Sequence, residues 1–492
     1  MKICLVYPDV GGVDYYGARK YYHGLGYLSS VLKQAGHETS LLYLEREQTA
    51  DDFVAQVEAL NPCVVAFSAT TNQYPYVVRC AAWLKRALPA TLTVVGGTHP
   101  TLVPEQVLGS RVFDALCVGE GEYPLLDLVT FIQDGRDPSS IANLWFSRPE
   151  GDVRNSLRPL LSDLDTLPFA DRDLFSFSEI LAANDGWVDM MAGRGCPYGC
   201  SYCSNPGLRE RYRGLGKYVR MRSVANLLTE IRELSSQYRI KVLNFQDDVF
   251  TLDREWALDF GRAYGEEFKY PYWINTRVER ITDEELVECL AKSGCRGVRI
   301  GLESGNEALR AQVLKRTMSN EQIRQAFALA DRYGLDVYTC NMLGIPGETA
   351  AMIDETIALN RELKPAGMQF SVFYPYPMTE LYETCVREGY LAEDAELKSY
   401  YERKSVLHLP TLSQTELERA YDRFEQLKLE LQMKHTSPPK YRVYQLLLWL
   451  MRGNSLKARS ILRHLGRLRD RLLNRQPSDR LTRSSSLGDS KP

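Results

Sequence analysis

The chain has 492 residues, which is enough for two or three domains. Its hydrophobic content of 44%, charged content of 25% and formal net charge of −3 are ordinary for a globular protein and give no argument for nucleic-acid binding. The N-terminus lacks the features of a signal peptide, and no stretch reaches the roughly 18 to 20 apolar residues that a membrane span requires. We therefore expect a cytoplasmic protein that does not bind nucleic acid.

The first part of the chain alternates strand-like and helix-like segments. Short apolar runs lie at residues 2–8, 39–45, 63–70, 92–97 and 115–121. Segments with helical periodicity separate them. This alternation predicts a Rossmann-like, doubly wound parallel sheet with helices on both faces over residues 1–140. Ligands of such sheets bind at the carboxyl ends of the strands.

A proline-containing linker at residues 141–186 leads into a second alternation. Its strand-like runs lie at residues 188–192, 241–246, 272–276, 297–303, 336–343 and 368–373. Six strand–helix units predict a partial (β/α)6 barrel of the TIM type over residues 187–390, with its chemistry at the C-terminal ends of the strands. After the barrel we expect a mostly α-helical region at 391–476 and a disordered, Ser-rich tail at 477–492.

The chain has 11 cysteines, most of them isolated among apolar residues as buried reduced thiols would be. The exception is Cys196, Cys200 and Cys203, which follow a predicted strand in a loop with Gly and Pro. Three thiolates can bind three irons of a 4Fe–4S cluster. The fourth iron is then free for a small molecule with an amine and a carboxylate, such as S-adenosylmethionine (SAM). A zinc site is the alternative, but zinc usually takes four Cys or His ligands and no fourth is near in sequence.

The CxxxCxxC motif, with Tyr202 before its third cysteine, resembles the signature of the radical SAM superfamily. Later segments over residues 187–385 match the same pattern in order. The resemblance makes the three cysteines metal-binding and catalytic, and makes Tyr202 part of the cofactor site. It also implies that Glu303 and Ser304 contact SAM. From the residues alone, Glu303 is equally well read as a surface carboxylate at a strand end.

Three further segments take part in this resemblance. NFQDDVFT implies that Asp247 and Asp248 face the site from the second strand, although a helix N-cap pair is the alternative. CNMLGIPGET places Gly344 near the adenine of SAM, although its glycines also suit a plain turn. In FYPYPMTELY, Met378 stands where relatives more often have Gly, so the sequence does not predict the backbone conformation of that turn. Tyr374 and Tyr376 lie here and receive no assigned role.

Residues 1–140 resemble the cobalamin-binding domain of the cobalamin-dependent radical SAM class. Small residues at strand ends allow a corrin and its nucleotide tail to approach the sheet edge. The resemblance assigns cofactor binding to Ser68, Thr70, Gly96, Gly97 and Glu120.

The DxHxxG motif that supplies a cobalt ligand in cobalamin mutases is absent, which argues against His-ligated cobalt. His99 follows the two glycines and is better suited to a hydrogen bond than to cobalt. A Rossmann-like domain that binds a different ligand, or none, remains the alternative.

The resemblance implies a radical SAM enzyme that cleaves SAM and abstracts hydrogen from an unactivated substrate carbon. It favours a cobalamin-dependent C-methyltransferase in lipid or secondary-metabolite biosynthesis that receives single electrons from a flavodoxin or ferredoxin. The alternatives are a cobalamin-associated radical cyclisation, rearrangement or redox conversion without methyl transfer, and a non-catalytic metal-binding or scaffold protein. Residues 441–475 hold nine Arg or Lys and predict an amphipathic helix that either packs on the barrel or makes a peripheral membrane contact.

Overall fold

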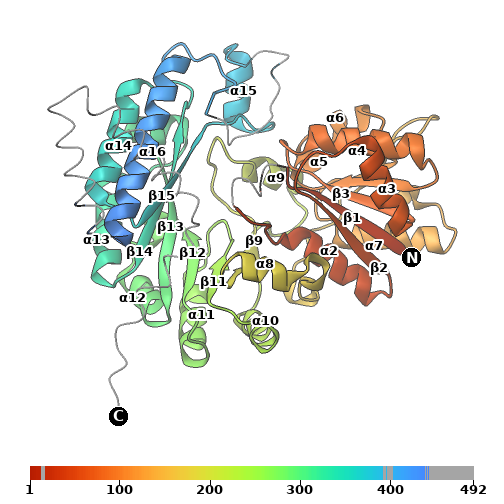
Figure 1. The fold of residues 1–492 in the computed structure, drawn as a ribbon, viewed down its shortest axis with the longest axis horizontal. Helices are drawn as coiled ribbons and strands as arrows, with labels where there is room; N and C mark the ends of the chain where they lie inside the picture. Colours follow the sequence, from red (N-terminus) through yellow and green to blue (C-terminus); the bar gives the residue numbers. More distant parts are fainter. Residues whose placement is uncertain are drawn as a thin grey trace.

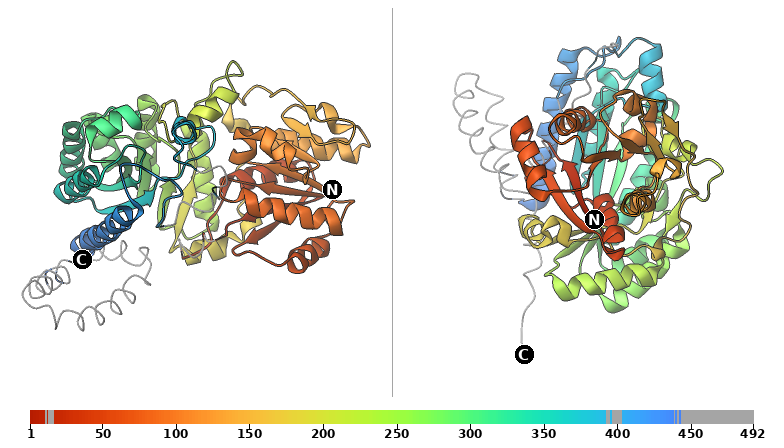
Figure 2. Two further views of the ribbon diagram at one scale, coloured as in Figure 1. Left: turned by 90° about the horizontal axis from the view of Figure 1, so that it is seen from above. Right: turned by 90° about the vertical axis from the view of Figure 1, so that its right-hand side faces the viewer.

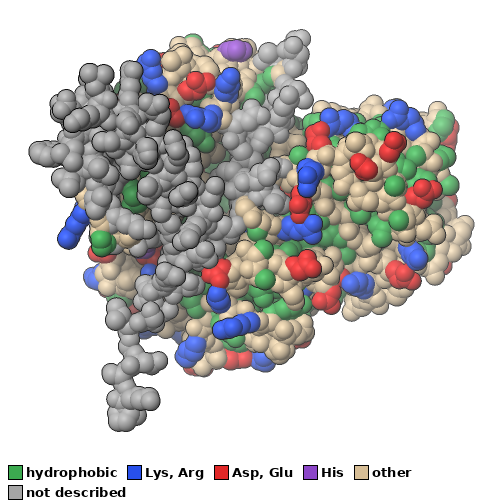
Figure 3. Space-filling model, in the orientation of Figure 1, with side chains coloured by type: hydrophobic (Ala, Val, Ile, Leu, Met, Phe, Trp, Pro, Cys, Tyr) green, Lys and Arg blue, Asp and Glu red, His purple; other side chains and the backbone are tan. Residues whose placement is uncertain are grey.

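The computed structural model describes residues 1–10, 12, 17–391, 395, 403–437, 439 and 442. Two α/β lobes lie side by side, an N-terminal domain and a larger curled sheet with its helices (Figure 1). On the face in Figure 3, basic and acidic side chains are interspersed over both lobes. Within the described residues, no helix is long and apolar enough to cross a membrane.

The N-terminal sheet has the strand order β2-β1-β3-β4-β5-β6-β7 within the described residues. Its strands are β1 (Lys2–Pro8), β2 (Glu38–Leu44), β3 (Val64–Ser68), β4 (Leu92–Gly96), β5 (Ala115–Cys117), β6 (Leu144–Phe146) and β7 (Val153–Arg154). The first five are parallel, in the order of flavodoxin-like sheets, whose ligand site is the switch point between β1 and β3. The antiparallel β6 and β7 carry the sheet past residue 140 into the expected linker.

Helices cover both faces of this sheet because successive residues of a strand point to opposite faces and the side chains on both faces are apolar. Ile3 and Leu5 pack with α2 (His23–Gln34) and α7 (Glu122–Gln133), whereas Cys4 and Val6 pack with α3 (Ala50–Leu60) and α4 (Tyr74–Ala87). The helices of this domain are α2 (His23–Gln34), α3 (Ala50–Leu60), α4 (Tyr74–Ala87), α5 (Thr98–Leu102), α6 (Pro104–Gly109) and α7 (Glu122–Gln133). The predicted doubly wound sheet is confirmed.

The second sheet is the predicted partial barrel. Its strand order is β15-β14-β13-β12-β11-β8 within the described residues, and all neighbours are parallel. Its strands are β8 (Trp187–Met190), β11 (Val242–Phe245), β12 (Tyr272–Thr276), β13 (Cys295–Glu303), β14 (Asp336–Leu343) and β15 (Gly367–Val372). A separate two-stranded antiparallel sheet, β9 (Gly193–Arg194) with β10 (Arg220–Met221), stands between the lobes (Figure 1).

Helices cover the convex face of the curled sheet, as the views in Figure 2 show. They are α10 (Val224–Gln237), α11 (Arg254–Glu267), α12 (Glu284–Lys292), α13 (Asn320–Arg332) and α14 (Ala350–Leu363). Three shorter helices lie elsewhere: α8 (Phe177–Ala183) precedes the barrel, α9 (Asn205–Arg211) contacts α5 of the first domain, and α15 (Glu380–Arg387) follows the last strand. Short 3-10 helices are η1 (Pro138–Ser140), η2 (Leu164–Thr166), η3 (Asp173–Phe175) and η4 (Val278–Arg280), and η5 (Leu309–Val313) is a short π-helix.

One long helix is described after the barrel, α16 (Gln414–Thr436). It begins at a capping box in which Ser413 and Glu416 bond to each other's backbone N–H groups. Its apolar residues Leu417, Phe424 and Leu427 pack on β15 and α14, so it closes the far edge of the sheet. The predicted basic helix at 441–475, apart from residue 442, and the predicted tail at 477–492 lie outside the described residues.

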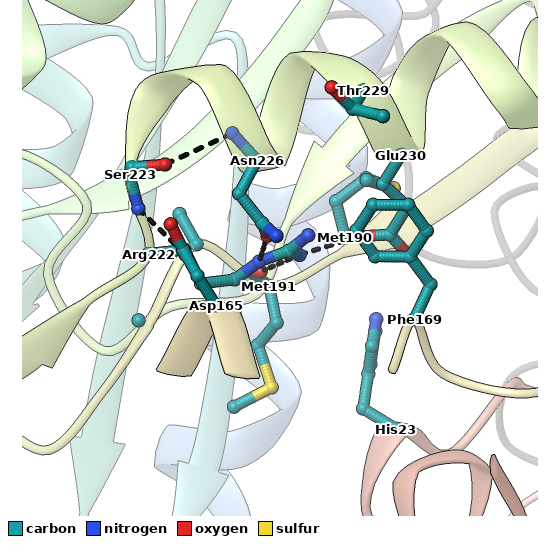
Figure 4. A network of polar contacts seen from close by, with 12 residues as sticks. His23, Asp165, Phe169, Met190, Met191, Arg222, Ser223, Asn226, Thr229 and Glu230 are labelled. Atoms are coloured by element: carbon teal, nitrogen blue, oxygen red, sulfur yellow. Dashed lines mark hydrogen bonds and ion pairs between the residues drawn. The ribbon is translucent and has the colours of Figure 1, made fainter. Parts of the chain in front are cut away.

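The two lobes share a continuous apolar core and a buried polar junction. Figure 4 shows His23, from the start of α2, near Glu230 and Arg222 of the barrel lobe. The His23 ring Nε2 lies 3.2 Å from the Asp189 carbonyl, and Arg172 donates to the same carbonyl at 2.9 Å. Arg222 pairs with the buried Glu230 carboxylate. Because buried charges are stable only when paired, this junction fixes the relative position of the lobes.

Candidate active site

The cysteine loop begins where β8 leaves the barrel, and a buried carboxylate anchors it there. Asp247 accepts N–H bonds from Ala192 at 3.1 Å and from Gly193 at 2.6 Å. Burial raises the pKa of Asp247 to about 7. The alternative of a helix N-cap is wrong for Asp247, since the cap of α11 is Asp253. The sequence thus places Asp247 at the site, where it holds the loop of Cys196.

The three thiols lie together in a polar surrounding. Cys196 and Cys200 are buried, and burial raises the pKa of Cys196 to about 11, with Cys203 and Cys200 adding to the rise. The Cys203 sulfur accepts from the backbone N–H of Asn205 at 3.5 Å and from its side-chain amide at 3.6 Å. That amide also donates to Asp248 at 3.1 Å. Donors at the sulfur stabilise a thiolate, which is the form that binds iron.

Among the described residues, no three His, Cys, Asp or Glu side chains converge closely enough to hold a single metal ion. A cubane makes a different demand, because each sulfur binds its own iron and the three sulfurs need not meet at one point. The loop fits this arrangement: three cysteines share one loop, and hydrogen-bond donors reach two of their sulfurs.

Two arginines that follow other strands reach the cysteine loop. Arg277, directly after β12, donates Nη1 to the Cys200 sulfur at 3.6 Å, and its guanidinium carbon lies 3.8 Å from the Tyr198 ring centre. Arg316, after η5, approaches the same sulfur at 3.9 Å. Both are buried. These contacts place two positive charges at Cys200.

Glu303, Tyr202 and Arg316 form a second group at the strand ends. The Tyr202 hydroxyl donates to Glu303 Oε1 at 3.0 Å and receives Arg316 Nη1 at 3.4 Å. Glu303 ends β13 with a φ of 65° and is 8% exposed, so the surface-carboxylate alternative is wrong. Burial raises the pKa of Glu303, and Arg316 opposes that rise. The structure therefore brings Tyr202 and Glu303 together with the cysteines.

Ser304 and Gly344 have mainly internal partners. Ser304 is fully buried, and its hydroxyl lies 3.4 Å from that of Thr356 in α14. Gly344 has a φ of 73° and donates its N–H to the buried Glu348 Oε2 at 2.7 Å. A contact of Ser304 or Gly344 with SAM stays a prediction. At the last strand, Met378 has a φ of 62°, so this turn keeps the backbone that suits glycine.

The concave face of the barrel is polar. Arg299 donates to Asn244 Oδ1 at 2.7 Å, and the Asn244 amide donates to Asp189 at 2.6 Å. Below them the Trp187 and Trp273 rings lie 6.4 Å apart, with the Arg299 guanidinium 5.2 Å from Trp273. The strands thus bring aromatic and hydrogen-bonding side chains together on this face of the sheet.

A cavity of about 360 Å³ opens at the carboxyl ends of β3, β4 and β5. Its lining includes Ser68, Gly96 and Gly97, as the sequence predicts. Gly97 has a φ of 103°, and a Cβ there would lie 2.8 Å from the Ala69 carbonyl oxygen. Because glycine keeps this wall thin, the backbone can approach a bound group closely. The volume lies within the ordinary range for ligand sites.

A second cavity, of about 420 Å³, lies between the first sheet and the barrel mouth. It is lined by Asp9 and the Thr70–Gln73 loop on one side and by Ser204 and Tyr376 on the other. The Thr70 hydroxyl donates to Gln73 Oε1 at 2.9 Å, so it is engaged within its own turn. His99 is 3% exposed, its ring centre lies 4.2 Å from that of Tyr74 in a tilted arrangement, and its Nδ1 lies 3.3 Å from the Thr71 hydroxyl of this loop.

Glu120 takes part in an interdomain clasp, the group Glu120, Glu122, Arg194 and Arg220. Arg220 binds both Glu120 oxygens, at 2.6 and 3.0 Å, and Arg194 bridges Glu120 at 3.1 Å and Glu122 at 2.6 Å. Burial raises the pKa of Glu120, but Arg220 and Arg194 outweigh it and hold this pKa below its ordinary value. The arginines engage both oxygens, so Glu120 joins the two domains, and a contact of Glu120 with a cofactor stays a prediction.

The clasp connects the two predicted sites. All four of its residues line the first cavity, and Arg194 stands two positions before Cys196. Four arginines at these sites are not predicted from the sequence: Arg194, Arg220, Arg277 and Arg316. The sequence signal that could have indicated them is an Arg close to the end of a short apolar run. This signal is weak because Arg is also common in solvent-exposed loops.

Residues 190–359 match the family model of the radical SAM superfamily, and residues 18–129 match that of the B12 binding domain. The chain belongs to the radical SAM enzymes that carry a B12-binding domain. The family model of this radical SAM enzyme implies a 4Fe–4S cluster and SAM, and its N-terminal domain implies cobalamin. Enzymes of this class also require an electron donor.

Relatives of this radical SAM enzyme have several activities. It is 28% identical to an uncharacterised methyltransferase of Pyrococcus horikoshii over 75% of this chain and 79% of that protein. It is 26% identical to the anaerobic magnesium-protoporphyrin IX monomethyl ester cyclase of Rubrivivax gelatinosus over 73% and 65%. The solved methyltransferase TsrM of Kitasatospora setae, bound to tryptophan and a SAM analogue, superposes with a TM-score of 0.67 at 19% identity, covering 87% and 89%. That superposition shows a shared fold.

Proposed function

We propose that this radical SAM enzyme transfers a methyl group to carbon of a polar small molecule bound in the barrel lumen. The observation that carries the proposal is the cavity between the two domains, which places the carboxyl edge of the B12-binding domain over the barrel mouth. A group held at that edge and a substrate in the lumen would then face each other.

Three features support the placement of the cofactors. Cys196, Cys200 and Cys203 would hold the cluster, and the Tyr202–Glu303–Arg316 group beside Cys200 would orient SAM at the open iron. The glycine-lined cavity of about 360 Å³ would receive the nucleotide tail of cobalamin. When bound, the cluster and SAM supply a hydrogen-abstracting radical, and cobalamin supplies the methyl group.

The chain's own residues position the reacting groups and hold charge. Asp247 fixes the start of the cysteine loop through the Ala192 and Gly193 N–H groups. Arg299, Asn244 and Asp189 form a hydrogen-bonded row on the concave face of the barrel that would orient a polar substrate.

The test is product analysis with methyl-labelled SAM. Protein reconstituted with iron, sulfide and cobalamin is incubated with a reductant, labelled SAM and an extract of small molecules from the source cells. We expect the label on carbon of a small molecule and unlabelled 5′-deoxyadenosine as a co-product. Formation of 5′-deoxyadenosine without any labelled product from this extract would contradict methyl transfer.

A second candidate is a radical cyclisation or redox conversion without methyl transfer. The similarity to the cyclase of Rubrivivax gelatinosus, at 26% identity, favours it. The same experiment separates the two candidates, because a cyclisation or redox conversion consumes the substrate and gives a new product that carries no label.

A further inference from the structure

Arg277 makes two contacts with the cysteine loop that the fold alone does not require. Its Nη1 donates to the Cys200 sulfur at 3.6 Å, and its guanidinium stacks on the Tyr198 ring at 3.8 Å. Tyr198 and Cys200 belong to the same CPYGC segment. Arg277 therefore holds that segment from the end of β12, whereas the Asn205 donors act at Cys203.

The Arg277 guanidinium is buried and held in place by its contacts. The side chain is 7% exposed, and its other terminal nitrogen pairs with Glu279 at 2.7 Å. Water screens such a charge poorly, so it acts strongly on groups nearby. Arg316 adds a second positive charge 3.9 Å from the same sulfur.

We propose that Arg277 is a positioning residue that raises the reduction potential of the cluster through Cys200. Reduction adds one electron from an external low-potential donor, and the cluster gains a negative charge. A positive charge and an N–H donor at a cysteine ligand favour the reduced state, and both are known determinants of cluster potential. Glu279 opposes this effect because its negative charge lies beside the same guanidinium.

The test is a redox titration of protein that carries both cobalamin and the cluster, in the absence of SAM. The electron paramagnetic resonance signal of the reduced cluster monitors the titration. Arg277→Gln keeps a neutral donor and removes the charge. We expect the ratio of reduced to oxidised cluster at the wild-type midpoint to fall about tenfold, which corresponds to about 59 mV for one electron. Arg277→Lys restores the charge and should recover most of that loss.

Glu279→Gln should shift the midpoint reduction potential in the opposite direction, to a value above that of the wild type. Arg254→Gln removes a positive charge from the outer helix layer, where it pairs with Asp283, and should leave the midpoint unchanged. A wild-type midpoint in Arg277→Gln, or shifts of the same sign in Arg277→Gln and Glu279→Gln, would overturn the proposal.

If Arg277→Gln does not retain a cluster, Glu279→Gln decides, and an unchanged midpoint there refutes the role. The proposal rests on the cluster and not on methyl transfer. Failure of the labelled-SAM experiment would therefore leave this titration unaffected, and the reverse also holds.

Discussion

Glu348 makes the stability of the barrel depend on pH. This carboxylate is fully buried after β14, and burial raises its pKa from 4.5 to about 8, although the Ile345 and Gly344 N–H groups oppose the rise. The folded protein therefore holds a proton that the unfolded chain loses above pH 4.5. Stability falls as the pH rises from about 4.5 to about 8 and levels off above that.

Replacement of Glu348 by glutamine removes this dependence. The glutamine side chain keeps an oxygen for the Gly344 and Ile345 N–H groups, while its amide faces the position of Oε1, which has no hydrogen-bond partner among the described residues. An unpartnered amide costs about 1–2 kcal/mol, so Glu348→Gln should be slightly less stable than wild type at about pH 5. Each pKa unit corresponds to about 1.4 kcal/mol, so the wild type should lose about 3–4 kcal/mol relative to the variant by about pH 8.

The assay is urea unfolding followed by tryptophan fluorescence at several pH values between about 5 and 8. The exposed Glu383→Gln, in α15, is the control for the loss of one negative charge. The Glu348→Gln variant and the wild type should exchange their order of stability within this range. A constant difference between them at all pH values would refute the assignment of a buried, protonated Glu348.

Three further predictions concern the sites. Gly97→Ala forces a Cβ against the Ala69 carbonyl and should raise the cobalamin dissociation constant, measured by equilibrium dialysis, at least about tenfold. Gly109→Ala has open space around it and should leave this constant unchanged. Equal affinities of the two variants would contradict binding of the nucleotide tail in the first cavity. Cys200→Ser should bind less than about half of the wild-type iron and sulfide after anaerobic reconstitution; full occupancy would remove Cys200 from the ligands. Glu120→Gln should destabilise the domain junction by about 1–3 kcal/mol in thermal unfolding, and an unchanged melting curve would show that the clasp carries no stability.

The sequence predicts the two sheets well because each depends on local signals. Apolar runs such as residues 63–70 and 336–343 are short, rich in β-branched residues and separated by amphipathic helices, which leaves few alternatives to parallel strands. The cysteine loop is equally local, since its three ligands lie within eight residues. Both features can therefore be predicted from the sequence alone.

The rest depends on contacts between distant segments. Glu120 is attractive as a cofactor ligand in sequence, but Arg220, 100 residues away, engages both of its oxygens. Arg277 reaches Cys200 across 77 residues. Ser304 follows Glu303 directly, yet the positive φ of Glu303 helps to send the two side chains to different surroundings. None of these pairings leaves a periodic pattern in the sequence.

The central claim is that a loop with three cysteines carries an iron–sulfur cluster under a bound corrin. Anaerobic purification and reconstitution, followed by iron, acid-labile sulfide, zinc and corrin analysis, tests it directly. We expect about four irons, about four sulfides and about one corrin per chain. A full complement of zinc with no labile sulfide would contradict it.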